Sequence, residues 1–186
     1  MGWWILIGVI VVVALFLIVI YNRLVSLRQV VGQSWSDISV QLKQRHDLVP
    51  NLVETVKGYA AHERGTLEAV TQARNAAVAA SNPQAQVAAE NMLTGALRQL
   101  FALSEAYPDL KANQNFQQLQ TELSDLENKI AASRRFFNNA VQEYNAAIQQ
   151  FPAVLIAGPM GFTARTFFDV DESERAAVNT APQVKF

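Results

Sequence analysis

Cysteine is absent from the 186 residues, and histidine occurs only twice. Without cysteine the chain forms no disulfides, has no thiol nucleophile and cannot bind zinc or an iron–sulfur cluster through thiolates. A large excess of one charge is also missing, because 15 Lys and Arg residues stand against 16 Asp and Glu residues, for a net charge of −1. Nucleic-acid binding depends on a basic excess, so this balance argues against a nucleic-acid partner.

Catalytic motifs that a helical protein could carry are missing as well. A di-metal site in a helical bundle uses Glu-x-x-His, but Lys43 precedes His46 at that spacing and Tyr59 precedes His62. The motif that starts at His62 also fails as a zinc-protease signature, because Thr66 stands where the second histidine belongs. No phosphate-binding glycine loop and no Gly-x-Ser-x-Gly is present. We therefore predict no catalytic residue, no cofactor and no metal site, and hence no enzyme.

An uncharged apolar run stands near the N-terminus, WWILIGVIVVVALFLIVIY at 3–21. As an α-helix it spans about 28 Å, close to the hydrocarbon thickness of a bilayer. A cleaved signal peptide would have a positive start, a shorter apolar core and small residues at its cleavage site, and this run has none of these. The sequence predicts a retained transmembrane anchor at 1–21, with the lipid bilayer as a partner. The residues expected at its two interfaces are Trp3, Trp4, Tyr21 and Arg23.

Positive charge follows the apolar run and does not precede it. The first basic residues are Arg23, Arg28, Lys43 and Arg45. Lys and Arg beside a membrane span favour the cytoplasmic side. We therefore expect a single-pass protein with its N-terminus outside and its C-terminal domain in the cytoplasm.

Apolar residues at seven-residue spacing dominate the next part of the chain. Within 113–151, an apolar or aromatic residue recurs at every seventh position from Phe116 to Phe151. This spacing is typical of a long helix in a bundle or a coiled coil. A second series of the same spacing runs through 22–80, strong from 31 to 59 and weaker beyond. The Ser-Asn-Pro triplet at 81–83 predicts the start of a further helix, because a capping residue precedes a proline.

Pro50 decides between two all-α folds. A proline removes a backbone donor and crowds the preceding turn of a helix, which predicts a chain turn at 46–50. The fold is then an N-terminal transmembrane helix followed by an antiparallel up-and-down four-helix bundle, with the domain at 22–151 and its helices at 22–48, 50–80, 83–106 and 113–151. The alternative is a three-helix arrangement with one long helix kinked at Pro50. It would leave Trp35, Ile38 and Leu42 uncovered unless other subunits cover them.

The C-terminal tail, 152–186, is apolar at first and then acidic. Its apolar part, PAVLIAGPMGF at 152–162, is too short and too broken by Pro and Gly to span a membrane. It either covers the open end of the bundle or contacts the membrane surface or another subunit. The four-helix fold returns this part to the membrane, whereas one long helix would hold it far away. The candidate contact residues are Val154, Leu155, Ile156, Met160, Phe162, Phe167 and Phe168, and the acidic patch is Asp169, Asp171, Glu172 and Glu174.

A polar cluster surrounds the expected turn, and its members are Arg45, His46, Asp47, Asn51 and Glu54. In a functional interpretation they form an interaction turn for a protein partner. In a structural interpretation Asp47 caps a helix that begins at 48–50, and Arg45 pairs with Glu54. Residue types alone leave both interpretations open.

Long stretches of the sequence resemble the LemA family. They are YNRLVSLRQ at 21–29, SWSDISVQLKQRHDLVPNLVETVKGYAAHERGTLEAVTQAR at 34–74, EAYPDLKANQNFQQLQTELSDLENKIAASRRFFNNAVQEYN at 105–145 and FP…GF…FF at 151–168. The resemblance implies a small protein of the bacterial cytoplasmic (inner) membrane, with an N-terminal anchor and a cytoplasmic helical bundle. It brings no catalytic residue, because the family has no established enzymatic activity.

The resemblance also bears on function. A relative, MamQ, belongs to the machinery of magnetosome membrane formation, and family members often lie beside an HtpX-like membrane metallopeptidase. With the anchor and the missing catalytic motifs, this predicts a non-enzymatic scaffold that forms a homo-oligomer through its helical domain and organises a membrane-associated assembly. The alternative is an adaptor for an HtpX-like membrane protease or an envelope-stress system.

Overall fold

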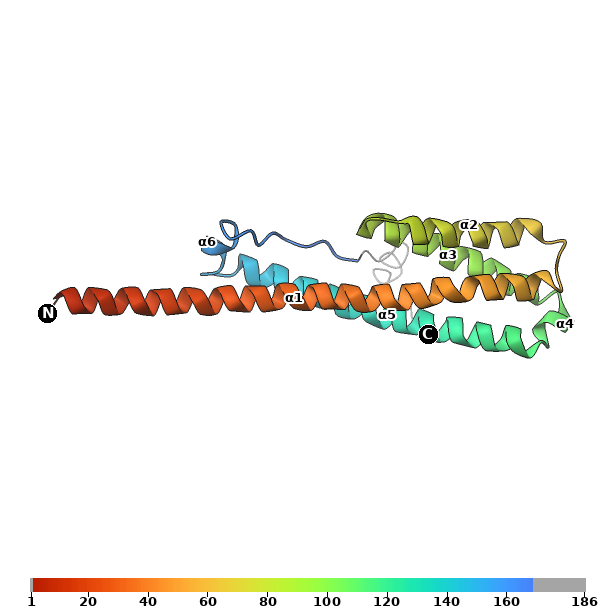
Figure 1. Cartoon of the computed structure of the whole chain (residues 1–186), viewed down its shortest axis with the longest axis horizontal. Helices are drawn as coiled ribbons and strands as arrows, with labels where there is room; N and C mark the ends of the chain where they lie inside the picture. Colours follow the sequence, from red (N-terminus) through yellow and green to blue (C-terminus); the bar gives the residue numbers. More distant parts are fainter. Residues whose placement is uncertain (1, 169–186) are drawn as a thin grey trace, which may run out of the picture. The chain divides into compact units, whose positions relative to one another are not determined.

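The computed structural model describes residues 2–168, apart from the side chains of Pro83 and Gln84. Helices make up most of this range, and no strand occurs within it. The all-α prediction is therefore confirmed for the part of the chain that the structure describes. The helices are α1 (Gly2–Lys57), α2 (Arg64–Ala79), α3 (Pro83–Ser104), α4 (Pro108–Lys111), α5 (Gln114–Gln149) and α6 (Val154–Ala157) (Figure 1).

These helices belong to two compact units. Unit 1 combines the described residues up to Arg45 with Leu123–Phe167. Unit 2 combines His46–Glu122 with Phe168. The two longest helices, α1 with 56 residues and α5 with 36 residues, each contribute to both units.

The turn predicted at 46–50, and with it the division into helices 22–48 and 50–80, is wrong. α1 continues past Pro50 to Lys57, and α2 begins only at Arg64. Pro50 lacks the N–H that would bond the carbonyl of His46 four residues earlier. Arg74 of α2 replaces this donor, because its Nε–H donates to the His46 carbonyl oxygen at 3.2 Å. The Pro50 ring itself is exposed, so the helix passes through the proline at little cost in packing.

Unit 1 is built on the antiparallel pairing of α1 with α5. The Trp35 and Phe137 rings lie 5.5 Å apart, and the Arg45 guanidinium lies 3.2 Å from Glu127. A step of ten residues forward along α1, from 35 to 45, corresponds to a step of ten residues back along α5, from 137 to 127. The two helices therefore run antiparallel. Ile38, predicted to lack a cover in a long helix, is fully buried in this unit. The seven-residue series of α5 supplies the opposing core with Leu123, Ile130, Phe137 and Tyr144.

Unit 2 is built from the end of α1, from α2, α3 and α4, and from the start of α5. α2 and α3 lie side by side (Figure 1). The predicted start of α3 is confirmed, since Asn82 Oδ1 accepts the Ala85 N–H at 2.8 Å and Pro83 opens the helix. α2 has 16 residues, so it is much shorter than the helix predicted at 50–80. The fully buried apolar side chains of this unit include Leu52, Val56, Val70, Leu93, Leu100 and Leu110.

Candidate functional site

The N-terminal part of α1 is long and apolar enough to cross a membrane. No side chain from Gly2 to Tyr21 is buried. A core helix of a soluble domain would be covered, and a continuous exposed apolar surface of this size marks an interaction with lipid or protein. The predicted interface residues Trp3, Trp4, Tyr21 and Arg23 are all exposed. Burial begins directly after them, at Leu24, which is 1% exposed.

The segment 151–165 folds back onto the part of α1 where burial begins. The Phe162 ring meets the Tyr21 ring edge to face at 5.6 Å, and the Arg28 guanidinium lies 5.1 Å from the centre of the Phe162 ring. Two residues of α5 fix the backbone that follows. Tyr144 O–H donates to the Thr163 carbonyl oxygen at 3.0 Å. This segment therefore lies beside the end of the apolar run in unit 1.

A pair of hydrogen bonds completes this attachment. Asn145 Nδ2 donates to the carbonyl oxygen of Arg165, and the Arg165 N–H donates to Asn145 Oδ1, each at 2.8 Å. One asparagine amide thus makes two hydrogen bonds to the backbone N–H and C=O of a single residue, as paired β-strands do with each other. Tyr21 and Arg28 belong to α1, and Tyr144 and Asn145 belong to α5, so these contacts join the segment to both long helices.

The prediction that one long helix would hold the tail far from the membrane depends on a chain path that the structure does not show. It assumed that a rod at 22–80 would carry the chain outward and that the last helix would also run outward. The chain turns at 58–63 instead, and α5 runs antiparallel to α1. As a result Phe162 reaches Tyr21 although α1 is continuous through Pro50.

The predicted tail contacts divide into exposed and covered residues. Val154, Leu155, Met160 and Phe167 are exposed, and Ile156 is partly exposed. Phe162 and Phe168 are buried, so these two side chains pack within the protein. The acidic patch of the tail lies outside the described residues.

The polar cluster around Pro50 does not form a turn. Arg45 and His46 are buried, whereas Asp47, Asn51 and Glu54 are exposed on the outer side of α1. The structural details expected for a turn are also wrong. Asp47 lies inside α1 and caps no helix, Arg45 pairs with Glu127, and Glu54 pairs with Lys57 at 3.4 Å.

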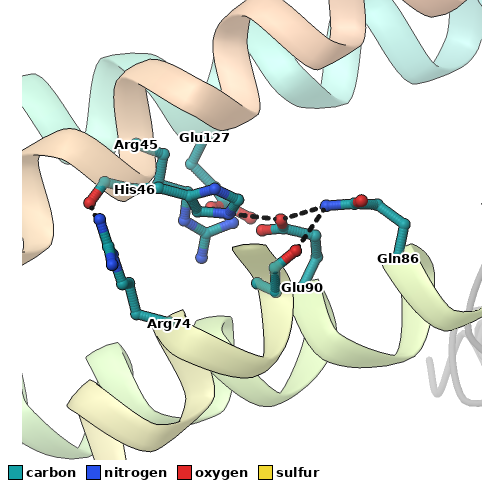
Figure 2. Close-up of polar contacts among 7 residues, drawn as sticks. Arg45, His46, Arg74, Gln86, Glu90 and Glu127 are labelled. Atoms are coloured by element: carbon teal, nitrogen blue, oxygen red, sulfur yellow. Dashed lines mark hydrogen bonds and ion pairs between the residues drawn. The ribbon is translucent and has the colours of Figure 1, made fainter. Parts of the chain in front are cut away.

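A buried polar network that the sequence did not reveal lies in unit 2. His46 Nε2 is 2.6 Å from Glu90 Oε1, and both side chains are almost fully covered (Figure 2). Gln86 Nε2 donates to the same Glu90 oxygen at 3.0 Å and to the Ala77 carbonyl oxygen at 3.2 Å. A carboxylate is costly to bury without such partners. The network therefore ties α1, α2 and α3 together at one level of the unit.

A sequence signal for this network exists but is weak. Glu90 stands among the apolar positions of α3, where Ala89, Leu93 and Leu97 are buried. A charged residue on such a stripe indicates a buried partner. The partner His46 is 44 residues away, and no local spacing identifies it.

The opposite end of unit 2 carries polar contacts around the chain turn at 58–63, one of them part-buried and one exposed. Tyr107 O–H donates to Glu63 Oε1 at 3.0 Å, and Asn113 Nδ2 donates to Tyr59 Oη at 2.9 Å. The hydrogen bond to the Glu63 carboxylate, with smaller effects of desolvation and of the carboxylate charge, raises the pKa of Tyr107 above its usual value of 10.0. Among the described residues there is no group of three or more His, Asp or Glu side chains that could hold a metal ion.

The sequence pattern of the LemA family matches residues 34–186. The chain belongs to the LemA family. The match includes His46, Glu90 and the segment that packs on α1, while the apolar run lies before it. Neither this match nor the geometry above assigns a catalytic residue to this LemA-family protein.

Curated relatives of this LemA-family protein carry two names. Protein LemA of Metamycoplasma hominis is 29% identical over 164 residues, which cover 86% of this chain and 74% of the relative. Magnetosome protein MamQ of Magnetospirillum gryphiswaldense is 25% identical over 174 residues, and MamQ 2 of Paramagnetospirillum magneticum is 24% identical over the same number. Both alignments cover 80% of this chain and 64% of the relative. The chain thus spans less than two thirds of the length of the MamQ proteins.

Proposed function

We propose that this LemA-family protein is a non-enzymatic scaffold that is anchored in the bacterial cytoplasmic membrane and self-associates through its helical domain. The observation that carries the proposal is the continuity of α1. Its first part is apolar and uncovered, and the same helix then enters the packed units without a break. Such a helix both anchors a body and holds it at a defined place relative to the bilayer.

The ends of the exposed run support a membrane span. Aromatic Trp3 and Trp4 stand at one end and Tyr21 at the other, where rings prefer the interface. Arg23 and Arg28 follow, and basic residues favour the cytoplasmic side. We therefore place the N-terminus outside and the helical domain in the cytoplasm.

Self-association is supported by the thinness of unit 1. The described helices of this unit are parts of the long helices α1 and α5 and the short α6. Two paired helices bury only the sides that face each other. Apolar side chains remain on the outer sides, with Val40 at 51% and Phe136 at 56% exposed. Exposed apolar side chains of this kind are available to a second copy of the chain.

The test is the mass of the full-length particle in mild detergent and in lipid discs. We expect a defined multiple of 20.6 kDa, and a smaller particle for Phe136→Asp. Asn128→Asp is the matched control, since it adds the same charge to an exposed position of α5. A monomer in both environments would remove self-association from the proposal, and equal oligomers for all three proteins would show that Phe136 does not take part in the contact.

An adaptor role for a membrane protease is the second candidate. An open groove of about 570 Å³ lies in unit 2 between the end of α1 and α2, and Val53, Glu54, Lys57, Arg64 and Leu67 line it. Volumes of this size are typical of ligand pockets, and Glu54 belongs to the cluster predicted for partner binding. A photo-crosslinker at Thr71 in the groove should capture an HtpX-like metallopeptidase in cells, and one at Val78 should not. Repeated capture of no protease at either position would count against the adaptor.

A further inference from the structure

The segment 151–160 presents apolar side chains to solvent beside the end of the apolar run. Phe151 is 81% and Leu155 is 65% exposed, while Val154 and Met160 are each about half exposed. No charged residue occurs from 151 to 160. Ala153 and Ala157 lie on the other side of the same segment and are buried. The segment thus has a small-residue face toward the protein and a large apolar face toward its surroundings.

The position of this face follows from its attachment. Phe162 packs edge to face on Tyr21, the last residue of the apolar run. The Tyr144 hydroxyl and the Asn145 amide hold the backbone at 163 and 165. The segment is therefore fixed at the level where α1 leaves the bilayer, if 3–21 span it.

The charges around the segment suit the same location. Arg23, two residues after Tyr21, and Arg165, three residues after Phe162, are both exposed. Basic side chains at a membrane boundary attract the anionic headgroups of the cytoplasmic leaflet. Apolar side chains beside them can enter the boundary between headgroups and acyl chains to a depth of about 5–10 Å.

We propose that the 151–160 face is a second membrane contact, which inserts Phe151 and Leu155 into the headgroup boundary of the leaflet that α1 leaves. The occupant is lipid and not a second copy of the chain, because the face is continuous with the anchor through the Tyr21–Phe162 contact. This inference rests on the proposed anchoring by α1. It adds that the domain lies against the bilayer at two points, so that its rotation about α1 is restricted.

The absence of native cysteine makes the test direct. Single cysteines replace Leu155, Val11 within the apolar run and Val78 in unit 2, and each carries an environment-sensitive fluorophore. All three native side chains are at least half exposed, so the labels leave the core intact. The full-length variants are placed in vesicles of phosphatidylethanolamine and phosphatidylglycerol that contain nitroxide-labelled lipid.

We expect the labels at Val11 and Leu155 to be quenched by lipid and blue-shifted, with Leu155 the shallower of the two, and the label at Val78 to behave as in water. If Val11 is quenched and Leu155 is not, the second contact is wrong and the anchor stands. If Val11 is not quenched, the anchoring itself is wrong, and the second contact falls with it. A Leu155 label that is shielded from water but not quenched by lipid identifies a protein cover and also overturns the inference.

A further variant separates insertion from mere proximity. A fluorophore on Phe151→Cys should be quenched by lipid, and adding Leu155→Asp should abolish this quenching, because a carboxylate resists the headgroup boundary. Val78→Asp is the matched control and should leave the quenching unchanged. Equal quenching with and without Leu155→Asp would show that the face does not enter the bilayer.

Discussion

Units 1 and 2 are both helical, yet they are stabilised in different ways. Unit 1 pairs two long helices through apolar residues at seven-residue spacing, and its Arg45–Glu127 ion pair reaches the surface, since the Glu127 side chain is 44% exposed. Unit 2 gathers shorter helices around the buried His46–Glu90 contact. The comparison teaches that a repeated spacing is enough to pair two long helices. Several short helices also require specific polar contacts that fix where they meet.

The largest expected effect is on unit 2. His46→Leu removes one partner of a fully covered carboxylate, and breaking a buried pair costs about 3–5 kcal/mol in the free energy of unfolding. Adding Glu90→Leu to this variant should recover a large part of the loss, because the buried charge is then gone. Hydrogen exchange of α3 amides in lipid discs measures both changes. A double variant that is less stable than His46→Leu would contradict the role given to this contact.

A large effect of a different kind is expected in unit 1. Ile130→Ala truncates a buried side chain of the seven-residue series, and such truncations cost about 2–5 kcal/mol. Lys129→Ala is the control, because Lys129 is exposed on the same helix. Exchange of amides in 123–149 should accelerate for Ile130→Ala alone. A loss below about 0.5 kcal/mol, the range of surface substitutions, would mean that the series does not form the core of unit 1.

An intermediate effect concerns how α1 passes Pro50. Arg74→Ala removes the donor to the His46 carbonyl, and a hydrogen bond from a charged group contributes about 1.5–3 kcal/mol. In a Pro50→Ala background residue 50 regains its own N–H, so the same substitution should cost less. Urea unfolding of the four proteins completes the cycle. Equal costs in both backgrounds would show that Arg74 does not compensate for the proline.

The smallest effect is on the titration of Tyr107. Its pKa is raised by the hydrogen bond to Glu63, so the neutral phenol is favoured in the folded protein. The stabilising contribution is complete below pH about 10, the unfolded value, and is lost as the pH rises through the higher folded pKa. Difference absorbance of tyrosinate, Glu63→Gln against the unsubstituted protein, should show one tyrosine that titrates earlier in the variant. Identical titration curves would exclude this hydrogen bond in solution.

Local sequence signals predicted the elements whose formation depends on residues close together in the chain. The heptad from Phe116, the Asn82 cap and the apolar run all depend on neighbours within one or two turns. The helices expected at 83–106 and 113–151 accordingly agree with α3 and α5 to within two residues at each end. The path of the chain at Pro50 was beyond such signals, because the compensating donor, Arg74, is 28 residues from the carbonyl that it bonds.

The candidate sites also combine features that follow from the local sequence with features that depend on residues far apart in the chain. The sequence left open whether Val154, Leu155 and Met160 cover the end of the bundle or lie on the surface, and the structure shows them exposed. The burial of Phe162 does not follow from the local sequence, because Tyr21 and Phe162 meet only through the antiparallel run of α5. The polar cluster at 45–54 is predicted to form one turn, yet the helix places Arg45 and His46 inward and Glu54 outward.

The continuity of α1 from Gly2 to Lys57 also fixes an angle. Each residue of an α-helix adds about 100° of rotation and about 1.5 Å of rise. One alanine inserted after Asn22 would therefore turn Leu24 and the core positions beyond it by about 100° relative to Tyr21, and four would complete slightly more than a full turn while adding about 6 Å. The short stretch between Tyr21 and Leu24 therefore sets the direction in which the packed part of α1 faces relative to the apolar run.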